Sequence, residues 1–256
     1  KKRYKMKKSF ILIAAFFLLF NAHGFCQFND YSKLNLKGKV KTVTEKTYQT
    51  VKAGETFIKG RMVQWYLNAF NTQGNKTEDI KYMSDSAVDK KYIYSYNTDG
   101  SRKEMAVYNA DNLLMYKIVY QYDDKGLLLE DISYDEKNRP GKKIAYLYGT
   151  NGKVMEENIY NAEGELRQKI RYSYNKSNLI AETNRYKDNG ELERRSTFKY
   201  DGKGSETEES EFSADGKLLS STTYLYQSDK QDNWIKKTAF VDNQAVLIVE
   251  RTIAYY

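Results

Sequence analysis

The sequence predicts an all-β fold, a repetitive antiparallel β-meander in a single, strongly coiled sheet of about fourteen or more strands. An aromatic residue followed four positions later by Gly or Asn recurs along most of the chain, with spacings that alternate between 12 and 14 residues. The resulting 26-residue period is typical of a repeat array. The aromatic anchors are Phe70, Tyr82, Tyr96, Tyr108, Tyr122, Tyr134, Tyr148, Tyr160, Tyr174, Tyr186, Tyr200, Phe212, Tyr226 and Phe240.

The Gly or Asn of each unit marks a turn. These two residue types adopt a positive φ angle at the least cost, and hairpin loops of three to five residues require such a position. Asp99-Gly100 and Asn151-Gly152 are strong turn signals of this kind. We therefore expect a left-handed residue in every turn. Ser86 occupies one of these positions without an evident reason in the sequence.

The segments between the turns alternate in character, as β-strands do. Leu114, Tyr116, Ile118, Tyr120 and Tyr122 form one such series. Because both repeat spacings are even, all anchor aromatics are expected on one face of the meander. Open twisted sheets rarely exceed about ten strands, so this sheet should coil, with the tyrosine face concave, or partly close.

The N-terminus predicts export. Residues 1–26 combine basic residues, the apolar run 10–20 and a small-residue cleavage site, after Gly24 or Cys26, which is the pattern of a signal peptide. A lipid anchor on Cys26 is disfavoured because the large Phe25 precedes it. We expect a periplasmic or cell-surface protein, with N-terminal capping strands in residues 27–69 and the repeat array with a C-terminal cap in residues 70–256.

Loss of the signal peptide changes the chemistry that is available. Residues 1–26 carry six Lys or Arg and no Asp or Glu, so the net charge falls from +8 to +2, which leaves no basic footprint for nucleic acid. The single histidine, His23, is also removed. Histidine-dependent nucleophilic sites and His-based zinc sites are then excluded. We expect no cofactor, no metal and no stable membrane span after cleavage.

A row of glutamates repeats with the same period. Glu78, Glu104, Glu130, Glu156, Glu182 and Glu208 lie 26 residues apart. A regular register that pairs Tyr148 with Val154 places these glutamates on the aromatic face. The expected cross-strand pairs are Tyr94 with Glu104, Tyr120 with Glu130, Tyr146 with Glu156 and Tyr172 with Glu182, while Glu208 would face Phe198.

This row has two interpretations. The pairs either satisfy polar groups within a half-buried ladder, or form a groove for a sugar, a peptide or a cation. Glutamates two strands apart would be about 9–10 Å from one another. That separation is too large for two of them to bind one calcium ion, whose ligands lie at about 2.3–2.6 Å.

Two units carry a family resemblance. Tyr122-Asp123-Asp124-Lys125-Gly126 and Tyr200-Asp201-Gly202-Lys203-Gly204 resemble the YD repeats of the RHS/YD-repeat family, and similar units occur in MORN-like variant repeats of envelope proteins. The resemblance implies strands wound into a sheet or shell, which in large members encloses a toxin domain. It implies no catalytic residue, and this chain is too short to enclose such a domain.

Three functions follow as hypotheses. The first is an exported, non-enzymatic binding or structural module of the cell envelope with a glycan or protein ligand. The alternative is a carboxylate-dependent glycoside hydrolase, which needs two carboxylates and no histidine; Glu206, Glu208 and Glu209 form the densest cluster. An outer-membrane barrel is disfavoured, because neither strand face offers the apolar band of about 25 Å that a lipid-facing wall needs.

Overall fold

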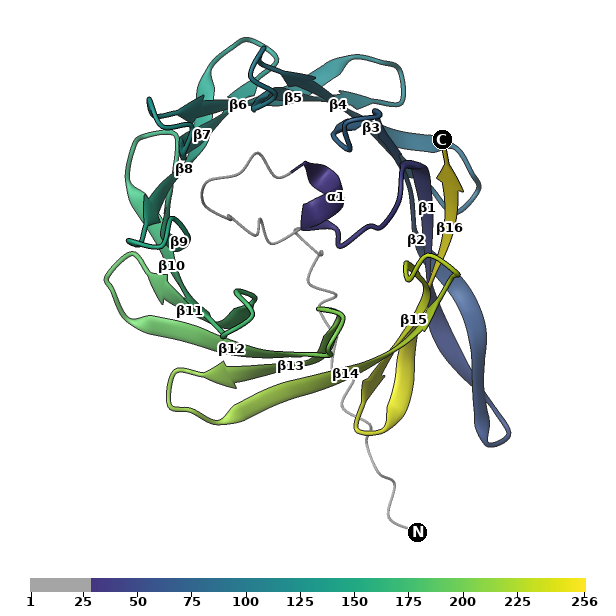
Figure 1. Ribbon diagram of the computed structural model, residues 1–256. Helices are drawn as coiled ribbons and strands as arrows, with labels where there is room; N and C mark the ends of the chain where they lie inside the picture. Colours follow the sequence, from purple (N-terminus) through teal and green to yellow (C-terminus); the bar gives the residue numbers. More distant parts are fainter. Residues whose placement is uncertain (1–28) are drawn as a thin grey trace.

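The computed structural model describes residues 29–256, which form a closed barrel of sixteen antiparallel strands (Figure 1). The predicted signal peptide therefore lies outside the described residues. The all-β meander is confirmed, and the fourteen strands β3–β16 correspond to the expected array. The elements are α1 (Asp30–Lys33), β1 (Val40–Ala53), β2 (Thr56–Phe70), β3 (Lys76–Tyr82), β4 (Val88–Tyr96), β5 (Arg102–Asn109), β6 (Leu114–Tyr122), β7 (Leu128–Asp135), β8 (Pro140–Tyr148), β9 (Val154–Tyr160), β10 (Leu166–Tyr174), β11 (Ile180–Lys187), β12 (Leu192–Tyr200), β13 (Glu206–Ser213), β14 (Leu218–Ser228), β15 (Trp234–Val241) and β16 (Gln244–Tyr255).

The sheet closes through its first and last strands. β1 pairs with β16, with Thr44 opposite Thr252, while every other pair joins strands that are neighbours in sequence. The segments expected to cap the two ends of an open array therefore pair with one another. Closure removes the free strand edges, which would otherwise be sites of edge-to-edge association.

The turns have the expected backbone. In the turn after β4, the Asn97 amide donates to the Ser101 carbonyl and the Gly100 amide donates to the Asn97 carbonyl. Gly100 has a φ of 81°. The corresponding residue is left-handed in the other turns of this kind, including Ser86, whose φ is 73°. The prediction of a left-handed turn position is confirmed.

The pairing register shifts by one residue beside each turn. Tyr148 pairs with Val154, but Tyr146 pairs with Glu157 rather than with Glu156. The second strand of the hairpin thus holds one extra residue, a β-bulge. As a result, even-numbered residues face the lumen on β8, whereas beyond the bulge they face outward on β9, and the same reversal recurs from hairpin to hairpin.

This bulge overturns the expectation that all anchor aromatics share one face. Tyr96 hydrogen-bonds Asp30 of α1, which lies within the barrel outline, so Tyr96 faces the lumen (Figure 1). On β4, the odd-numbered residue Lys91 faces outward, on the side opposite to Tyr96. Tyr108 pairs with Lys91 and therefore also faces outward. The anchors therefore alternate. The lumen receives Tyr96, Tyr122, Tyr148, Tyr174, Tyr200 and Tyr226, and the exterior receives Tyr82, Tyr108, Tyr134, Tyr160, Tyr186 and Phe212.

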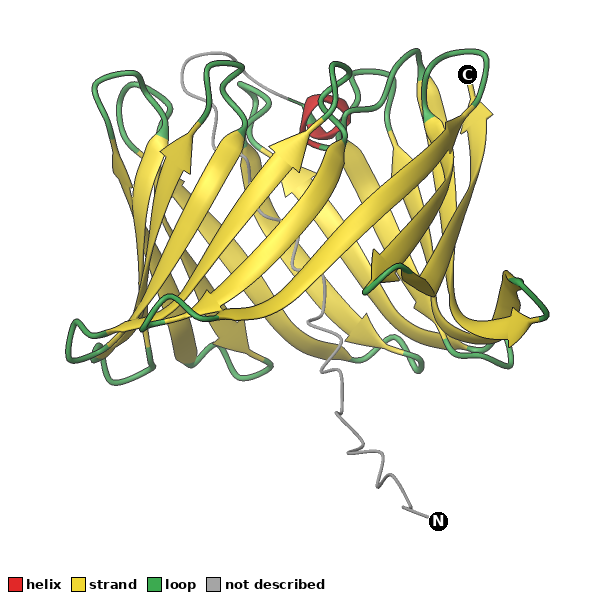
Figure 2. Cartoon of the chain, turned by 90° about the horizontal axis from the view of Figure 1, so that it is seen from below, coloured by secondary structure: helices red, strands yellow, loops and turns green. Residues whose placement is uncertain are grey.

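Residues 29–39, here called the strap, lie at the end of the barrel that also holds the C terminus (Figure 2). We call this end the mouth. Asn29 caps α1 by accepting from the Ser32 amide, and Tyr31 packs on Phe70 with ring centroids 5.2 Å apart. A small buried cluster forms there around Tyr31, Leu36, Val40, Val43 and Phe70. A second cluster lines the opposite inner wall and contains Tyr146, Val154, Tyr172, Ile180 and Phe198.

Barrel closure is testable by cross-linking. Directly opposed residues on paired strands have β-carbons close enough for a disulfide. In a Cys26→Ser background, the double variant Thr44→Cys/Thr252→Cys should form an intramolecular disulfide, seen as a mobility shift on non-reducing gels. Thr44→Cys/Leu67→Cys, which joins the hairpin partners β1 and β2, is the matched control. An open sheet would cross-link the control pair alone.

Candidate functional site

The mouth is lined by a row of fixed tyrosines. The hydroxyl of each donates to the backbone carbonyl of the residue 20 positions earlier, on a neighbouring strand, as in Tyr148 to Leu128 at 2.8 Å. The 26-residue repeat reproduces this bond around the wall. The row consists of Tyr96, Tyr122, Tyr148, Tyr174, Tyr200 and Tyr226, bonded to residues 76, 102, 128, 154, 180 and 206. Each ring is only partly exposed, and its orientation is set by its own hydroxyl.

A second tyrosine row lies deeper in the lumen wall, and four of its members bond carboxylates 15 positions earlier. Tyr94 donates to Asp79 and Tyr146 to Asp131, both at 2.6 Å, and Tyr224 donates to Glu209 at 3.3 Å. Tyr172 makes the same bond to Glu157. Tyr120, Tyr146, Tyr172 and Tyr224 are buried. This row is therefore part of the packed wall, and its carboxylate partners are not the glutamates that the sequence predicted as partners of these tyrosines.

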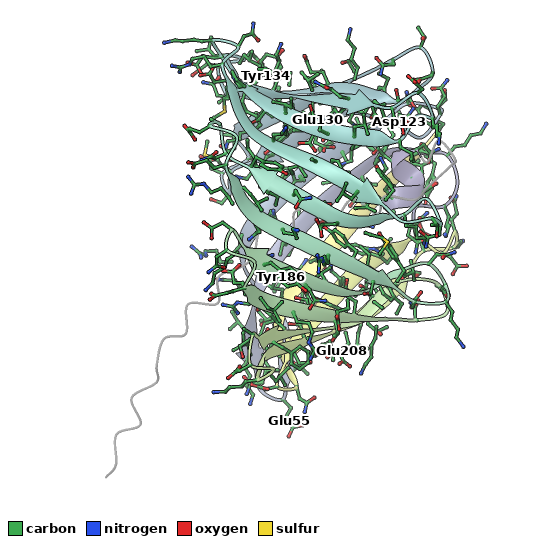
Figure 3. All side chains as sticks on the ribbon, turned by 90° about the vertical axis from the view of Figure 1, so that its left-hand side faces the viewer. Glu55, Asp123, Glu130, Tyr134, Tyr186 and Glu208 are labelled. Atoms are coloured by element: carbon green, nitrogen blue, oxygen red, sulfur yellow. The ribbon has the colours of Figure 1, made fainter. Side chains whose placement is uncertain are left out.

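The predicted glutamate row lies on the other side of the wall. The pairing register turns Glu104, Glu130, Glu156, Glu182 and Glu208 outward, away from Tyr94, Tyr120, Tyr146 and Tyr172. Glu130 and Glu208 are labelled in Figure 3. The expected pairs are wrong, because the bulge advances each partner by one residue. Tyr94 faces Met105, Tyr120 faces Asp131, Tyr146 faces Glu157, Tyr172 faces Thr183, and Phe198 faces Glu209. Tyrosines and glutamates thus form no common groove, and ligand binding by the outer glutamates stays a prediction.

The outer glutamates pair instead with a row of cations that also repeats every 26 residues. Glu104 lies 3.6 Å from Lys117, and Glu130 lies 3.4 Å from Lys143. Glu156 contacts both Lys169 at 3.2 Å and Arg171 at 2.8 Å. Glu182 continues the row with Arg195, whereas Glu208 pairs with Lys199, which lies outside the 26-residue series. Each such surface pair contributes about 0–1 kcal/mol. Their main effect is to make the middle of the outer wall charged.

Several carboxyl groups of the lumen wall have a raised pKa. Burial raises the pKa of Glu157 to about 7, although the bond from Tyr172 opposes the shift. Burial and the neighbouring Glu209 raise the pKa of Glu206 to about 7. Burial also raises the pKa of Asp131. Glu157 and Glu206 are therefore partly protonated near neutral pH, Glu157 beside a tyrosine hydroxyl and Glu206 beside a like charge.

Asp30 fixes the strap to the wall. It accepts from Arg102 at 2.7 Å and from the Lys76 amide at 2.7 Å, and both charged side chains are almost fully buried. Burial alone would raise the pKa of Asp30, but the Arg102 and Lys33 charges outweigh it, so the pKa is lowered. Asp30 thus remains ionised as the anchor of the strap. None of these residues was singled out as an anchor by the sequence.

The other end of the strap borders a polar pocket at the mouth. The pocket has a volume of about 210 Å³ and is lined by Asn35, Lys37, Asp201, Lys203, Ser205, Tyr226, Ser228, Asp232 and Trp234. The rings of Tyr226 and Trp234 meet edge to face, with centroids 5.9 Å apart. Arg251 covers one face of Trp234 at 3.4 Å and pairs with Glu45 at 2.9 Å. The pocket thus combines two aromatic rings with charged and amide groups.

The true polar partners of the lumen tyrosines left a signal in the sequence. Asp79, Asp131, Glu157 and Glu209 occupy positions of the same 26-residue period, one position after the glutamate row, in a series that Met105 and Thr183 interrupt. The unit that has Phe198 in place of tyrosine has Thr183 in place of the carboxylate. This joint change indicates which row partners the tyrosines, whereas Tyr120, with Met105 fifteen positions earlier, has no carboxylate at this position. The pocket residue Asp232 lies in an irregular turn and Trp234 begins the strand that follows it, where no repeat pattern indicated them.

Among residues 29–256, no group of three or more His, Cys, Asp or Glu side chains is arranged to hold a metal ion. Within the same range, helix α1 has four residues. No helix there has the length and apolarity needed to cross a membrane.

A family model described as "Uncharacterised protein" matches residues 102–253, which is more than half of the chain. That description names neither RHS nor YD repeats, so the YD-repeat resemblance stays a prediction. No curated protein matches the chain.

Solved structures of similar shape include two from Bacteroides. A porin-like protein from Bacteroides uniformis ATCC 8492 has a TM-score of 0.56 and 13% identity, covering 85% of this chain and 98% of that chain. A porin-like protein from Bacteroides vulgatus ATCC 8482 has a TM-score of 0.48 and 14% identity, with the same coverage. A TcdB2-TccC3 chain reaches only 0.29 with 11% identity, over 80% of this chain and 13% of that one. At these identities, the B. uniformis protein supports the barrel fold alone, and the other two carry no argument.

The adjacent residues Glu156 and Glu157 allow a matched pH experiment. The folded protein holds the Glu157 proton up to about pH 7, whereas the unfolded chain releases it near its ordinary pKa of 4.5. The native state binds more protons in this window, so the free energy of unfolding should fall as pH rises from about 4.5 to 7, by about 3 kcal/mol for this group. Glu157→Gln should remove that part of the pH dependence, measured by urea unfolding.

Glu156→Gln is the control for that measurement. Burial would raise the pKa of Glu156, but bonds from Arg171, Asn158 and Lys169 lower it. Its stabilising contribution is present above its unfolded pKa and is lost only as the pH falls to acid values. The control should therefore keep the decline between pH 4.5 and 7. If the two variants have the same pH profile, the opposite placement of the two side chains is wrong.

Proposed function

We infer that this chain, which belongs to the family described as "Uncharacterised protein" and matched over residues 102–253, is an exported, non-enzymatic barrel of the bacterial cell envelope that binds glycans at its mouth. The observation that carries the proposal is the row of six tyrosines around the mouth, whose rings are partly exposed and whose hydroxyls are all bonded to backbone carbonyls.

Fixed aromatic rings suit the recognition of sugars. A sugar ring has apolar C–H faces and polar edges, and ligand sites generally combine aromatic surface with a few placed polar groups. The tyrosine row supplies the aromatic surface. The turns above it carry Asp123, Asn175 and Asp201, whose Oδ1 atoms accept backbone amides of their own turns, so that these polar side chains are held in place beside the rings. Because the hydroxyls already hold the rings in place, binding orders few additional side chains, which favours affinity.

The carboxylates of the lumen wall favour a non-enzymatic role. Asp131, Glu157 and Glu209 are engaged by tyrosines and belong to the repeating wall. An active site generally interrupts a repeat, and these groups follow it. The hydrolase alternative rests on one observation, the neighbouring lumen carboxyls Glu206 and Glu209, both with raised pKa. Release of reducing sugar that Glu206→Gln abolishes would favour that alternative.

The charged outer wall supports a location in water. The Glu–Lys and Glu–Arg pairs lie near the middle of strands β5–β12. A lipid-facing barrel wall needs an apolar band about 25 Å tall at that height, and a Lys or Arg at the membrane midplane costs about 2–4 kcal/mol. We therefore propose a periplasmic or surface-exposed protein that can be extracted without detergent.

Glycan binding is tested with a glycan array, followed by calorimetry with each bound glycan. Tyr174→Leu, in the mouth row, should weaken binding about tenfold, since it removes an aromatic contact worth about 0.5–1.5 kcal/mol beyond burial. Tyr160→Leu, in the outer row, is the matched control and should bind as the wild type does. Thermal unfolding of both variants separates lost binding from lost structure.

The proposal fails if the array and calorimetry detect no glycan, or if the two tyrosine variants weaken binding equally while both remain folded.

A further inference from the structure

We propose that the pocket between the strap and the turns after β12 and β14 is a binding site for a single neutral sugar unit, with Trp234 as its aromatic wall. This inference rests on the proposed function and specifies where at the mouth the sugar is held. The pocket is defined by Asn35, Lys37, Asp201, Lys203, Ser205, Tyr226, Ser228, Asp232 and Trp234, and is named the strap pocket below.

The strap pocket is rigid because its three segments are hydrogen-bonded to one another. Asn233, buried to 1% exposure, accepts from the Lys37 amide at 2.7 Å and donates to the Lys37 carbonyl at 2.9 Å. It also donates to the Tyr255 hydroxyl, which in turn donates to Asp229 at 2.6 Å. Asn35 donates to the Lys203 carbonyl at 3.1 Å. The strap is therefore held against both turns without any ligand.

The aromatic wall is held from behind. The guanidinium of Arg251 lies 3.4 Å from the Trp234 ring centroid and is fixed by Glu45. The Tyr226 hydroxyl donates to the Glu206 carbonyl, which fixes the second ring. Because Arg251 covers one face of the indole, a ligand contacts the remaining ring surface that lines the pocket. Stacking against the C–H face of a sugar is the contact that such a wall offers.

The polar lining is balanced in charge. Lys37 and Lys203 oppose Asp201 and Asp232, and Lys203 lies 2.6 Å from Asp232 at the exposed rim. Lysine and asparagine side chains donate hydrogen bonds, while aspartates accept them. Each lysine already has a partner in the lining, Lys37 in Asn35 and Lys203 in Asp232. A neutral polyhydroxyl ligand can contact these donors and acceptors without adding charge, whereas an anion or a cation would meet like charge on one side. The volume, about 210 Å³, is below the range of about 300–1,000 Å³ for drug-sized ligands, which favours one sugar unit.

The chain contains two tryptophans, Trp65 and Trp234, which makes the pocket directly observable by fluorescence. Trp65 lies on the outer wall, stacked on Tyr82 with Lys46 over its ring. Trp65→Phe leaves Trp234 as the only reporter, and Trp234→Phe leaves Trp65. The full chain carrying each substitution is titrated with free glucose, galactose, mannose, N-acetylglucosamine and, as an anionic comparison, glucuronic acid.

At least one neutral sugar should produce a saturable change in the fluorescence of the Trp65→Phe protein, and no sugar should change that of the Trp234→Phe protein. Glucuronic acid should bind more weakly than the neutral sugar. If no neutral sugar alters Trp234 fluorescence, or if both reporters respond alike, the strap pocket is not the sugar site.

Asp232→Asn tests the polar lining without disturbing the backbone. Asp232 has a φ of 62°, a conformation that asparagine adopts readily. Loss of the charged acceptor should weaken the sugar about five- to tenfold, since charge-assisted hydrogen bonds are roughly twice as strong as neutral ones. Asp242→Asn is the matched control, because Asp242 has a φ of 51° in the turn after β15, away from the pocket. Equal affinities for the two variants would overturn the assignment.

The outcomes also separate this inference from the function on which it rests. Calorimetric binding of array-identified glycans, together with an unresponsive Trp234, would retain glycan binding by the mouth and reject the strap pocket. Failure of both measurements would reject the two proposals together.

Discussion

One additional residue in the second strand of each hairpin determines how this barrel is built. Without it, the even repeat spacings would place every anchor aromatic and every repeated glutamate on one side of the sheet. With it, Tyr148 pairs with Val154, but Tyr146, two residues earlier, pairs with Glu157. Even-numbered residues therefore face the lumen on one strand, and odd-numbered residues face it on the next. A 26-residue repeat thus holds two half-units of opposite orientation. The lumen, the outer wall and the mouth take their chemistry from this alternation.

The two walls are stabilised by different interactions. The lumen side is a layer of tyrosines whose hydroxyls donate to carbonyls 20 residues earlier or to carboxylates 15 residues earlier, so aromatic burial and hydrogen-bond satisfaction coincide. Leaving such a buried polar group unpaired costs about 1–3 kcal/mol. The outer side carries weak, water-exposed ion pairs. Since each strand pairs with its two neighbours in the sheet, stability is distributed around the ring, and pairing of β1 with β16 makes that ring continuous.

The repeat in the sequence was sufficient to predict the all-β meander, the fourteen strands of the array and the left-handed turn residues. Those features depend on local properties, namely strand alternation and the φ preferences of Gly and Asn. The side on which Glu156 lies depends on a bulge, which has no residue signature here, since Met155 at the bulge is an ordinary strand residue. The irregular end of the chain, with Asn233 and Trp234, acquires its role from contact with the strap 196 positions away in sequence, as between Lys37 and Asn233. No local pattern encodes such a contact.

The most direct test of the alternation uses two adjacent residues of β11, in a Cys26→Ser background. Glu182 faces outward, paired with Thr197 and contacting Arg195, while Thr183 pairs with Tyr172 and faces the lumen. Single variants Glu182→Cys and Thr183→Cys are reacted with a bulky polyethylene-glycol maleimide, in the folded state and in urea. The account predicts rapid labelling of Glu182→Cys and much slower labelling of Thr183→Cys when folded, with equal rates in urea. Rapid labelling of Thr183→Cys and protection of Glu182→Cys in the folded protein would contradict it.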